Sequence, residues 1–336
     1  MRPTNPEPSL DQFLATRPVT DGRVDAATLG RLLQPVCAAA GAITRAMRRG
    51  ALGGLLGGAG AVNVQGEHVQ QLDRFGNERF VEAARGNGLI CTVVSEEMEK
   101  PEHFSHACGA DRYALLIDPV DGSSNIDLNL SIGTIFSLLP VHDSPRHGAG
   151  DDLLRPGRDQ IAAGYVLYGP GAVLVFTAGC GVHGFTLDPD RDEFVLTHED
   201  IRLPERGTSY SVNEGNYHKW PAGTQRAVDA LKRPSENGRP YSLRYVGALV
   251  ADLHRTLLTG GLYLYPGEAA KPEGKLRLLY ECAPLAFVAE QAGGRASTGR
   301  ERILDLMPRS LHQRCPLVIG SAADVAEAEN YMRETL

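Results

Sequence analysis

The spacing of apolar residues predicts helices in the first quarter of the chain. Ser9-Leu10-Asp11-Gln12 has the residues of a capping box, so a short helix should start there. Apolar residues recur at helical spacing from Ala26 to Arg49, which predicts a long helix with a kink or break at Pro35. The glycine-dense segment 50–60 predicts a mobile loop, and a further helix is expected at 77–85.

Short apolar runs separated by turn residues predict strands in the middle of the chain. Strands are expected at 91–94, 113–117 and 131–139, an exposed loop at 142–159, and a β-meander at 161–168, 172–177, 182–187 and 193–196. From residue 201 onward strands and helices alternate, with strands at 210–212, 244–246 and 262–265, helices at 224–232 and up to 259, and a last long helix after Glu281. The pattern predicts a layered α/β (α+β) protein with an N-terminal domain 1–198 and a C-terminal domain 199–336.

Composition narrows the class of protein. The chain has 336 residues and a net charge of −7, so no basic excess is available to bind nucleic acid or an anionic membrane. Six cysteines are scattered without a CxxC pair, which favours a reduced, cytoplasmic protein. The N-terminus has no apolar segment of the signal-peptide type, and the Ala/Gly-rich stretch 38–62 is interrupted by three arginines, so we expect no membrane span.

The most informative segment is Asp118–Asp127, DPVDGSSNID, which follows the apolar run 113–117. Asp118 and Asp121 offer two carboxylates to a hard cation across a Pro-initiated turn. Gly122-Ser123-Ser124 offers backbone N–H groups and hydroxyls that suit phosphate oxygens. The alternative is a solvated surface turn, but the preceding strand and the density of acids favour a site.

Other acids follow predicted elements in the same way. Glu96 and Glu97 come directly after the run 92–95, at the end of a strand where open α/β sheets place ligands. If the two strands are neighbours, four carboxylates converge, and they then require bound cations. Oxygen ligands favour Mg²⁺, Mn²⁺ or Ca²⁺ over zinc.

Glu281 stands at the start of the last predicted helix, with Lys275 and Arg277 just before it. Together they could form a phosphate clamp beside a metal ligand. A helix-dipole glutamate with two exposed cations is the other interpretation.

Two loops carry weaker signals. Asn213–Tyr217 and Arg244-Tyr245 could donate hydrogen bonds to a sugar phosphate, although turn and packing roles are commoner for such residues. His103, His106 and Cys108 lack a second ligand pair at zinc spacing and are interpreted as a loop cluster. No HExxH, GxSxG or P-loop motif occurs, and the acids are spaced D-x-x-D, which disfavours an aspartyl-phosphate phosphatase.

Taken together, these segments resemble class I fructose-1,6-bisphosphatases. The matching motifs, collinear from about residue 11 to the C-terminus, are VSEE (94–97), DPVDGSSNID (118–127), SIGTIF (131–136), AAGYVLYG (162–169), SVNEGNY (211–217), RYVGALVADLHRTLLTGGLYLYP (244–266) and KLRLLYECAPLAFVAEQAGG (275–294). The related inositol monophosphatases share only the acid core.

The resemblance implies a fold and an activity. The expected fold is the sugar-phosphatase fold of alternating helix and sheet layers. The expected reaction is removal of the 1-phosphate from fructose 1,6-bisphosphate, the gluconeogenic step. It should need two or more Mg²⁺ per subunit, with Mn²⁺ as a substitute, in a cytoplasmic homotetramer.

The resemblance also implies roles for particular residues. Asp73 and Glu97 would orient and deprotonate the attacking water. The metal ligands would be Glu96, Asp118, the Val120 carbonyl, Asp121, Glu281 and Glu67. The substrate would be held by Asp121, Gly122, Ser123, Ser124, Asn213, Arg244 from a neighbouring subunit, Tyr245, Tyr263, Leu264, Tyr265, Lys275 and Arg277.

The chain departs from the family in segments linked to regulation. Ala26–Gly30 replaces the Thr-Gly-Glu-Leu-Thr turn at which animal members bind AMP, and Pro140 replaces an expected basic residue; both argue against AMP inhibition. The segment 142–159 has no cysteine for a light-driven disulfide switch. Two alternatives stay open: a form that also takes sedoheptulose 1,7-bisphosphate, and a non-catalytic sugar-phosphate-binding regulator.

Overall fold

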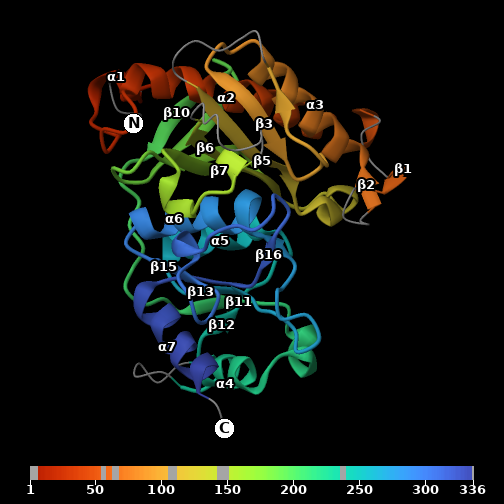
Figure 1. Ribbon diagram of the computed structural model, residues 1–336, viewed down its shortest axis with the longest axis vertical. Coiled ribbons are helices and arrows are strands. Elements are labelled where there is room, and N and C mark those ends of the chain that lie inside the picture. The colour runs from red at the N-terminus through yellow and green to blue at the C-terminus, as the bar shows by residue number, and fades with distance from the viewer. Residues whose placement is uncertain are drawn as a thin grey trace.

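The structure of the chain is a computed structural model, which describes residues 7–53, 58–62, 68–104, 112–141, 151–234 and 240–334. Figure 1 shows helix and sheet layers that alternate along the long axis of the molecule. Helices α1 (Leu10–Thr16), α2 (Ala26–Arg49) and α3 (Gln71–Arg85) cover the outer face of the larger sheet. Helices α5 (Leu249–Thr259) and α6 (Ala283–Gln291) lie between the two sheets, and α4 (Ala222–Leu231) and α7 (Ala322–Arg333) lie beyond the smaller one.

The larger sheet has eight strands in the order β10-β9-β8-β7-β6-β5-β3-β4. Their bounds are β3 (Ile90–Ser95), β4 (Glu102–His103), β5 (Tyr113–Asp121), β6 (Ile132–Pro140), β7 (Ala162–Tyr168), β8 (Ala172–Thr177), β9 (His183–Asp188) and β10 (Glu193–His198). Only β3 and β5 pair in parallel within this sheet. The predicted β-meander is therefore confirmed as β7 to β10, joined by antiparallel pairing.

The smaller sheet has five strands in the order β12-β11-β13-β17-β15. Their bounds are β11 (Ser209–Ser211), β12 (Ser242–Leu243), β13 (Leu262–Tyr265), β15 (Arg295–Ser297) and β17 (Leu317–Gly320). Two short ribbons complete the described strands, β1 (Gly58–Val62) with β2 (His68–Gln70) and β14 (Leu276–Arg277) with β16 (Arg314–Cys315).

The largest apolar clusters follow the layers. Phe13, Leu32, Phe80 and Ile117 belong to the cluster under the outer helices, and Tyr165, Leu253 and Phe287 to the one between the sheets. A third cluster packs α4 and α7 against the smaller sheet. Helix α6 is buried along almost its whole length, because a helix between two sheets has no face directed to water. This agrees with the expected layered α/β fold.

Several predicted element boundaries are wrong. Helix α2 runs unbroken through Pro35, which is itself buried in the helix, so no break occurs there. Helix α3 begins six residues before the expected helix at 77. Part of the expected glycine-rich loop is strand β1, and 244–246 is irregular because the strand is β12, two residues earlier.

The end of the chain and one loop also differ from expectation. Helix α6 is short and is not the last, because β15, β16, β17 and α7 follow it. Tertiary packing creates those short strands, and their apolar runs are too brief to stand out in the sequence. Residues 142–150 of the expected exposed loop lie outside the described residues, whereas Leu153 in its second half is buried.

Two further expectations concern the cysteines and the membrane. Cys37, Cys180, Cys282 and Cys315 are free, but Cys91 forms a disulfide bond, so the expectation of a fully reduced chain is wrong at that residue. Among the described residues, α2 is the single helix long and apolar enough to cross a membrane by length and composition. Half of its apolar window is buried against the rest of the protein, as in a core helix, so this is weak evidence for a span.

Candidate active site

The first pair of acids is brought together by the parallel pairing of β3 and β5. Ser95 is opposite Ile117 in this ladder, and the Glu96 N–H donates to the Ile117 carbonyl at 3.0 Å. Glu96, directly after β3, therefore lies beside Asp118 in β5. Both are buried, with exposed fractions of 7% and 4%. The expectation that the two strands are neighbours is confirmed.

Asp121 is held by the start of helix α5. Its Oδ1 accepts from the Leu249 N–H at 3.1 Å, and its Oδ2 accepts from the Val250 N–H at 2.7 Å. The first N–H groups of a helix have no partner within the helix, so a carboxylate there satisfies them. Strand β5 extends through Asp121 with irregular register between Asp118 and Asp121, where a simple turn was expected.

Glu281 enters from a different part of the chain. It lies in a single π-helical turn, Leu278–Cys282, and is 4% exposed. Such turns often occur at functional sites because the extra residue redirects side chains. Glu281 Oε2 accepts from the Arg277 backbone N–H, and the buried Arg277 guanidinium lies 2.7 Å from Glu96 Oε1 and 4.0 Å from Glu281 Oε2.

The acids disturb one another's ionisation. Burial, followed by the charges of Glu96, Glu281 and Asp121, raises the pKa of Asp118 well above its usual value. The pKa of Glu281 is raised well above its usual value by burial and by Glu96. Burial also raises the pKa of Asp121 to about 6, against the two helix N–H groups that lower it. Carboxylates that repel one another in a buried site are suited to a cation.

The charge among these acids is balanced in part by Arg277. Among the described residues, no group of three or more His, Cys, Asp or Glu side chains is arranged to hold a metal ion. The Arg277 guanidinium lies between Glu96 and Glu281 and contributes a positive charge beside these carboxylates. The donor set nevertheless fits a hard divalent cation, because it consists of buried carboxylate oxygens.

The phosphate-type turn follows directly on Asp121. Gly122 has φ +81°, and a Cβ there would lie 2.6 Å from the Ala248 Cβ. The position therefore requires glycine on both conformation and space. Ser123 is half-buried and Ser124 exposed, at the start of the 3-10 helix Ser123–Leu128. The N–H groups of this turn are available at the edge of the acid cluster.

Two buried hydroxyl groups, on Thr134 and Tyr168, form hydrogen bonds that hold the backbone at Pro119. Thr134 Oγ1 donates to the Pro119 carbonyl at 2.7 Å, and the Tyr168 hydroxyl donates to Thr134 Oγ1 at 2.9 Å. Asp118 Oδ1 accepts from the Val120 N–H at 3.1 Å. The backbone between Asp118 and Asp121 is thus held by hydrogen bonds at Pro119 and Val120.

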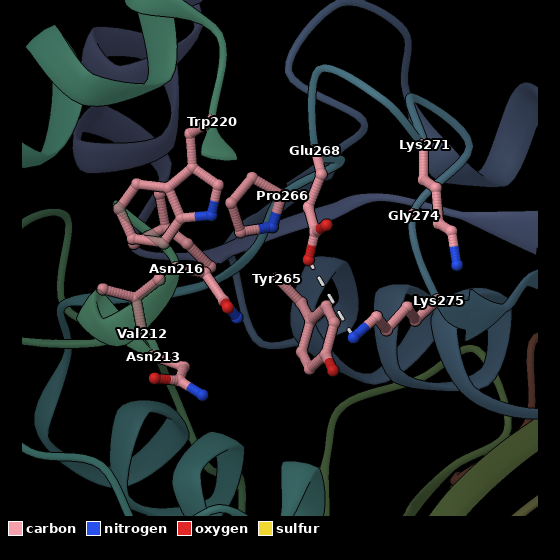
Figure 2. Close-up of a pocket in the computed structure, with 11 residues that line it drawn as sticks. Val212, Asn213, Asn216, Trp220, Tyr265, Pro266, Glu268, Lys271, Gly274 and Lys275 are labelled. Atoms are coloured by element: carbon pink, nitrogen blue, oxygen red, sulfur yellow. Dashed lines mark ion pairs between the residues drawn. The ribbon is translucent and has the colours of Figure 1, made fainter. Parts of the chain in front are cut away.

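A separate pocket lies beside the smaller sheet and contains about 370 Å³ of empty space, part of it open to solvent. Figure 2 shows Asn213, Asn216 and Trp220 on one side of it, Lys271 and Lys275 on the other, and Tyr265 between them. The Lys275 ammonium lies 3.9 Å from Glu268 Oε1. The pocket thus combines two cations, two amides and aromatic surface, which is chemistry suited to a phosphorylated sugar.

The pocket brings together part of the predicted substrate set. Asn213, Leu264, Tyr265 and Lys275 line it, but Arg277 lies with the acids instead. Tyr263 is buried in the core between the sheets, with 2% exposed. Arg244 is exposed and Tyr245 is 41% exposed, on the irregular segment after β12.

The two predicted catalytic acids, Asp73 and Glu97, lie in helix α3 and directly after Glu96, respectively. Asp73 is buried in the first turn of α3, where its Oδ2 accepts from the Gln70 N–H at 2.8 Å. Glu97 is half-buried just after β3. Glu67, His106 and Cys108 lie outside the described residues.

Sequence reasoning missed several residues that line the pocket, namely Trp220, Pro266, Glu268, Lys271 and Gly274. Trp220 meets the other four only in the folded chain, and those four lie in the segment just before Lys275 without a recognisable motif spacing. The proximity of Lys271 to Lys275 in the sequence was the one signal that could have pointed to a second cation.

Comparisons with known proteins identify the family of the chain. The family model "Fructose-1-6-bisphosphatase, N-terminal domain" matches residues 16–199, and the corresponding C-terminal model matches 203–333. A protein of Synechococcus sp. (strain JA-2-3B'a(2-13)) named fructose-1,6-bisphosphatase class 1 is 56% identical over 84% of each chain. A protein of the same name from Nostoc punctiforme is 49% identical over 92% of this chain and 88% of its own.

A solved structure is similar over nearly the whole chain. The crystal structure of Leishmania major fructose-1,6-bisphosphatase in holo form superposes with a TM-score of 0.90 at 37% identity. The similarity covers 98% of this chain and 100% of that one. It shows that the layered α/β fold is the fold of this enzyme class.

Proposed function

Because the chain belongs to the class I fructose-1,6-bisphosphatase family, we propose that it hydrolyses the 1-phosphate of fructose 1,6-bisphosphate to fructose 6-phosphate and phosphate, as a step of gluconeogenesis. One observation supports this most directly. Lys275 lines the sugar-phosphate pocket, and Arg277, two residues later at the end of β14, reaches the acids. Lys275 directly precedes β14, and two residues of extended chain span at most roughly 7 Å, so the backbone positions of the two cations are close. A substrate with an anionic group at each end suits this arrangement.

Magnesium is the proposed cofactor. The residues that would hold it are Glu96, Asp118, Asp121 and Glu281 with the Val120 carbonyl, a set of hard oxygen donors. A bound divalent metal would polarise the phosphoryl oxygens and lower the pKa of the attacking water. The N–H groups of Gly122, Ser123 and Ser124 would hold the transferred phosphate, and their turn passes so close to Ala248 that a side chain at Gly122 has no room.

Asp73 and Glu97 are proposed as the groups that orient and deprotonate the attacking water. Asp73 is buried and fixed by the Gln70 N–H, whereas Glu97 is partly open to solvent. A positioned carboxylate can accept a proton when it lies within hydrogen-bond reach of the water. Asn213, Tyr265 and Lys275 would bind the sugar and its 6-phosphate.

A homotetramer is proposed for the assembly. Leu128 and Leu130 are 67% and 47% exposed, and Leu243, Tyr245 and Val246 are 42%, 41% and 38% exposed. Asn125 Nδ2 donates to the Ser131 and Val246 carbonyls, so these two apolar loops lie together. Arg244 projects from the same surface, which would let it reach a neighbouring subunit. Light scattering of the purified protein measures the assembly directly.

We also propose that the protein is cytoplasmic. Cys37, Cys282 and Cys315 are free thiols and would suit the reducing cytoplasm. The disulfide at Cys91 is unusual for that compartment.

The activity is tested by phosphate release from fructose 1,6-bisphosphate with Mg²⁺, with EDTA and with the Asp121→Ala variant. We expect release only in the first case. The Lys275→Met variant should raise KM roughly ten- to hundredfold, because a charge-assisted hydrogen bond contributes about 1.5–3 kcal/mol. Lys100→Met, at an exposed lysine that does not line the pocket, is the matched control. Activity that persists in both EDTA and Asp121→Ala contradicts the metal mechanism.

A further inference from the structure

Asp252 is a fully buried carboxylate that the proposed chemistry does not use. It lies in the first turn of helix α5 with 0% exposure. Its Oδ1 accepts from the Ser211 hydroxyl at 2.7 Å and from Arg255 Nη1 at 3.0 Å. The Val246 N–H lies 3.1 Å from Oδ1 and 3.0 Å from Oδ2, and the Gly247 N–H donates to Oδ2 at 3.1 Å. Donors from three segments therefore meet on one side chain.

Two of these segments carry proposed substrate residues. Ser211 ends strand β11, two residues before Asn213 in the pocket. Val246 and Gly247 directly follow Arg244 and Tyr245. The segment 244–247 is irregular and largely exposed, so the carboxylate is a principal restraint on its backbone.

The helix that carries Asp252 also holds the acid cluster. The N–H groups of Leu249 and Val250, in the same first turn, donate to Asp121. Ala248 contacts the Gly122 position of the phosphate turn. One helical turn thus touches the acids on one side and, through Asp252, the sugar-phosphate loops on the other.

We propose that Asp252 is a positioning residue that sets the substrate loops at a fixed place relative to the acid cluster. This inference rests on the proposed function, because it takes as substrate contacts Asn213 and also Tyr245, which the family resemblance implies. A carboxylate is needed at the position because four donors converge on two oxygens. An asparagine has one acceptor oxygen and would direct an NH₂ group at another donor.

The test is a comparison of kinetic constants and stability in purified enzyme with Mg²⁺. Asp252→Asn should raise KM for fructose 1,6-bisphosphate about tenfold or more, and the Mg²⁺ concentration for half-maximal activity should change less than about twofold. Ser211→Ala removes a single donor and should raise KM about two- to threefold. This milder variant keeps the inference testable if Asp252→Asn does not fold.

A matched control is Asp324→Asn. Asp324 is also a buried carboxylate, 3% exposed, and accepts from the Gly207 N–H at 2.9 Å, the Tyr241 hydroxyl at 2.8 Å and Arg206 at 3.2 Å. None of those donors belongs to the pocket or to segment 244–247. Its loss should lower the melting temperature and leave KM unchanged. If Asp252→Asn behaves in the same way, its role is structural and the inference is overturned; an unchanged KM in Ser211→Ala overturns it equally.

Two further variants separate this inference from the proposed function. Asn213→Ala and Tyr245→Phe should each raise KM if those residues contact the sugar phosphate. If neither does so, the proposed substrate site is wrong. If both do so while Asp252→Asn and Ser211→Ala leave KM unchanged, the substrate site stands and the positioning role of Asp252 is wrong.

Discussion

Replacing Gly122 with alanine perturbs the close packing of the phosphate turn against Ala248, the residue before helix α5. Gly122 has φ +81°, a conformation that costs an L-residue about 1–2 kcal/mol. The new Cβ would also lie 2.6 Å from the Ala248 Cβ and 3.2 Å from the Ala248 Cα. Overpacking of this kind costs about 1–3 kcal/mol. We therefore expect a loss of about 2–5 kcal/mol of unfolding free energy.

Activity should fall with stability, because the clash can be relieved only by moving the turn away from Ala248. That movement displaces the N–H groups of residues 122–124 from Asp121. Urea unfolding measures the free energy, and phosphate release at saturating Mg²⁺ measures kcat and KM. The control is Gly86→Ala, at the end of α3, where φ is −84° and nothing lies within 4 Å of an added Cβ. That variant should be neutral or more stable by about 0.4–1 kcal/mol.

The reasoning is refuted if Gly122→Ala unfolds within about 0.5 kcal/mol of the wild type and retains full activity. A loss of stability in Gly86→Ala equal to that in Gly122→Ala would point to a general cost of alanine in this chain. The two glycines differ in φ and in the space available, so only the local geometry of Gly122 predicts a difference.

Three other perturbations have expected outcomes. Thr134→Val removes the hydroxyl under Pro119 and should cost about 1–3 kcal/mol in urea unfolding, because a buried carbonyl loses its donor; an unchanged midpoint contradicts this. Burial lowers the pKa of His254 to about 4, so it stays neutral in the fold while the unfolded chain takes up a proton below pH 6.5. The contribution of His254 to folding stability is present above pH 6.5 and is lost as the pH falls towards 4. The melting temperature of the His254→Gln variant should therefore change less between pH 7 and pH 5 than that of the wild type. Mg²⁺ binding at pH 6 should release protons, because burial raises the pKa of Asp121 to about 6; calorimetry in two buffers with different ionisation enthalpies detects the release, and equal heats argue against it.

The sequence was sufficient for the acid cluster because strand and acid are adjacent in the chain. Glu96 and Asp118 each follow an apolar run, so pairing of the two strands brings them together at one edge. The spacing of Lys275, Arg277 and Glu281 in an otherwise apolar segment likewise indicated a pair of cations close to an acid. Their spacing could not show that Lys275 lines the pocket whereas Arg277 lies among the acids. The position of Arg277 depends on the π-helical turn that brings Glu281 to it.

Local pattern failed where packing overrides propensity. Pro35 lies within an unbroken α2, because a long apolar helix face buried in the core outweighs one missing hydrogen bond. The short strand β17 pairs with β13, and β15 pairs with β17, so both depend on partners distant in the chain; three or four residues show no periodicity of their own.

The sequence by itself determined the layered fold class and the family, and it predicted the acids and the glycine of the proposed metal and phosphate turn, since each of these depends on residues that are close together in the chain. Only the tertiary structure decided which residues from distant segments share a surface. Arg277 joins Glu96, Asp121 meets the start of α5, and Asp252 joins Ser211 to Val246. Those contacts link residues far apart in the chain, and the segments that carry them are brought together by burial of the apolar layers, which is not directional and leaves no local pattern at the polar residues.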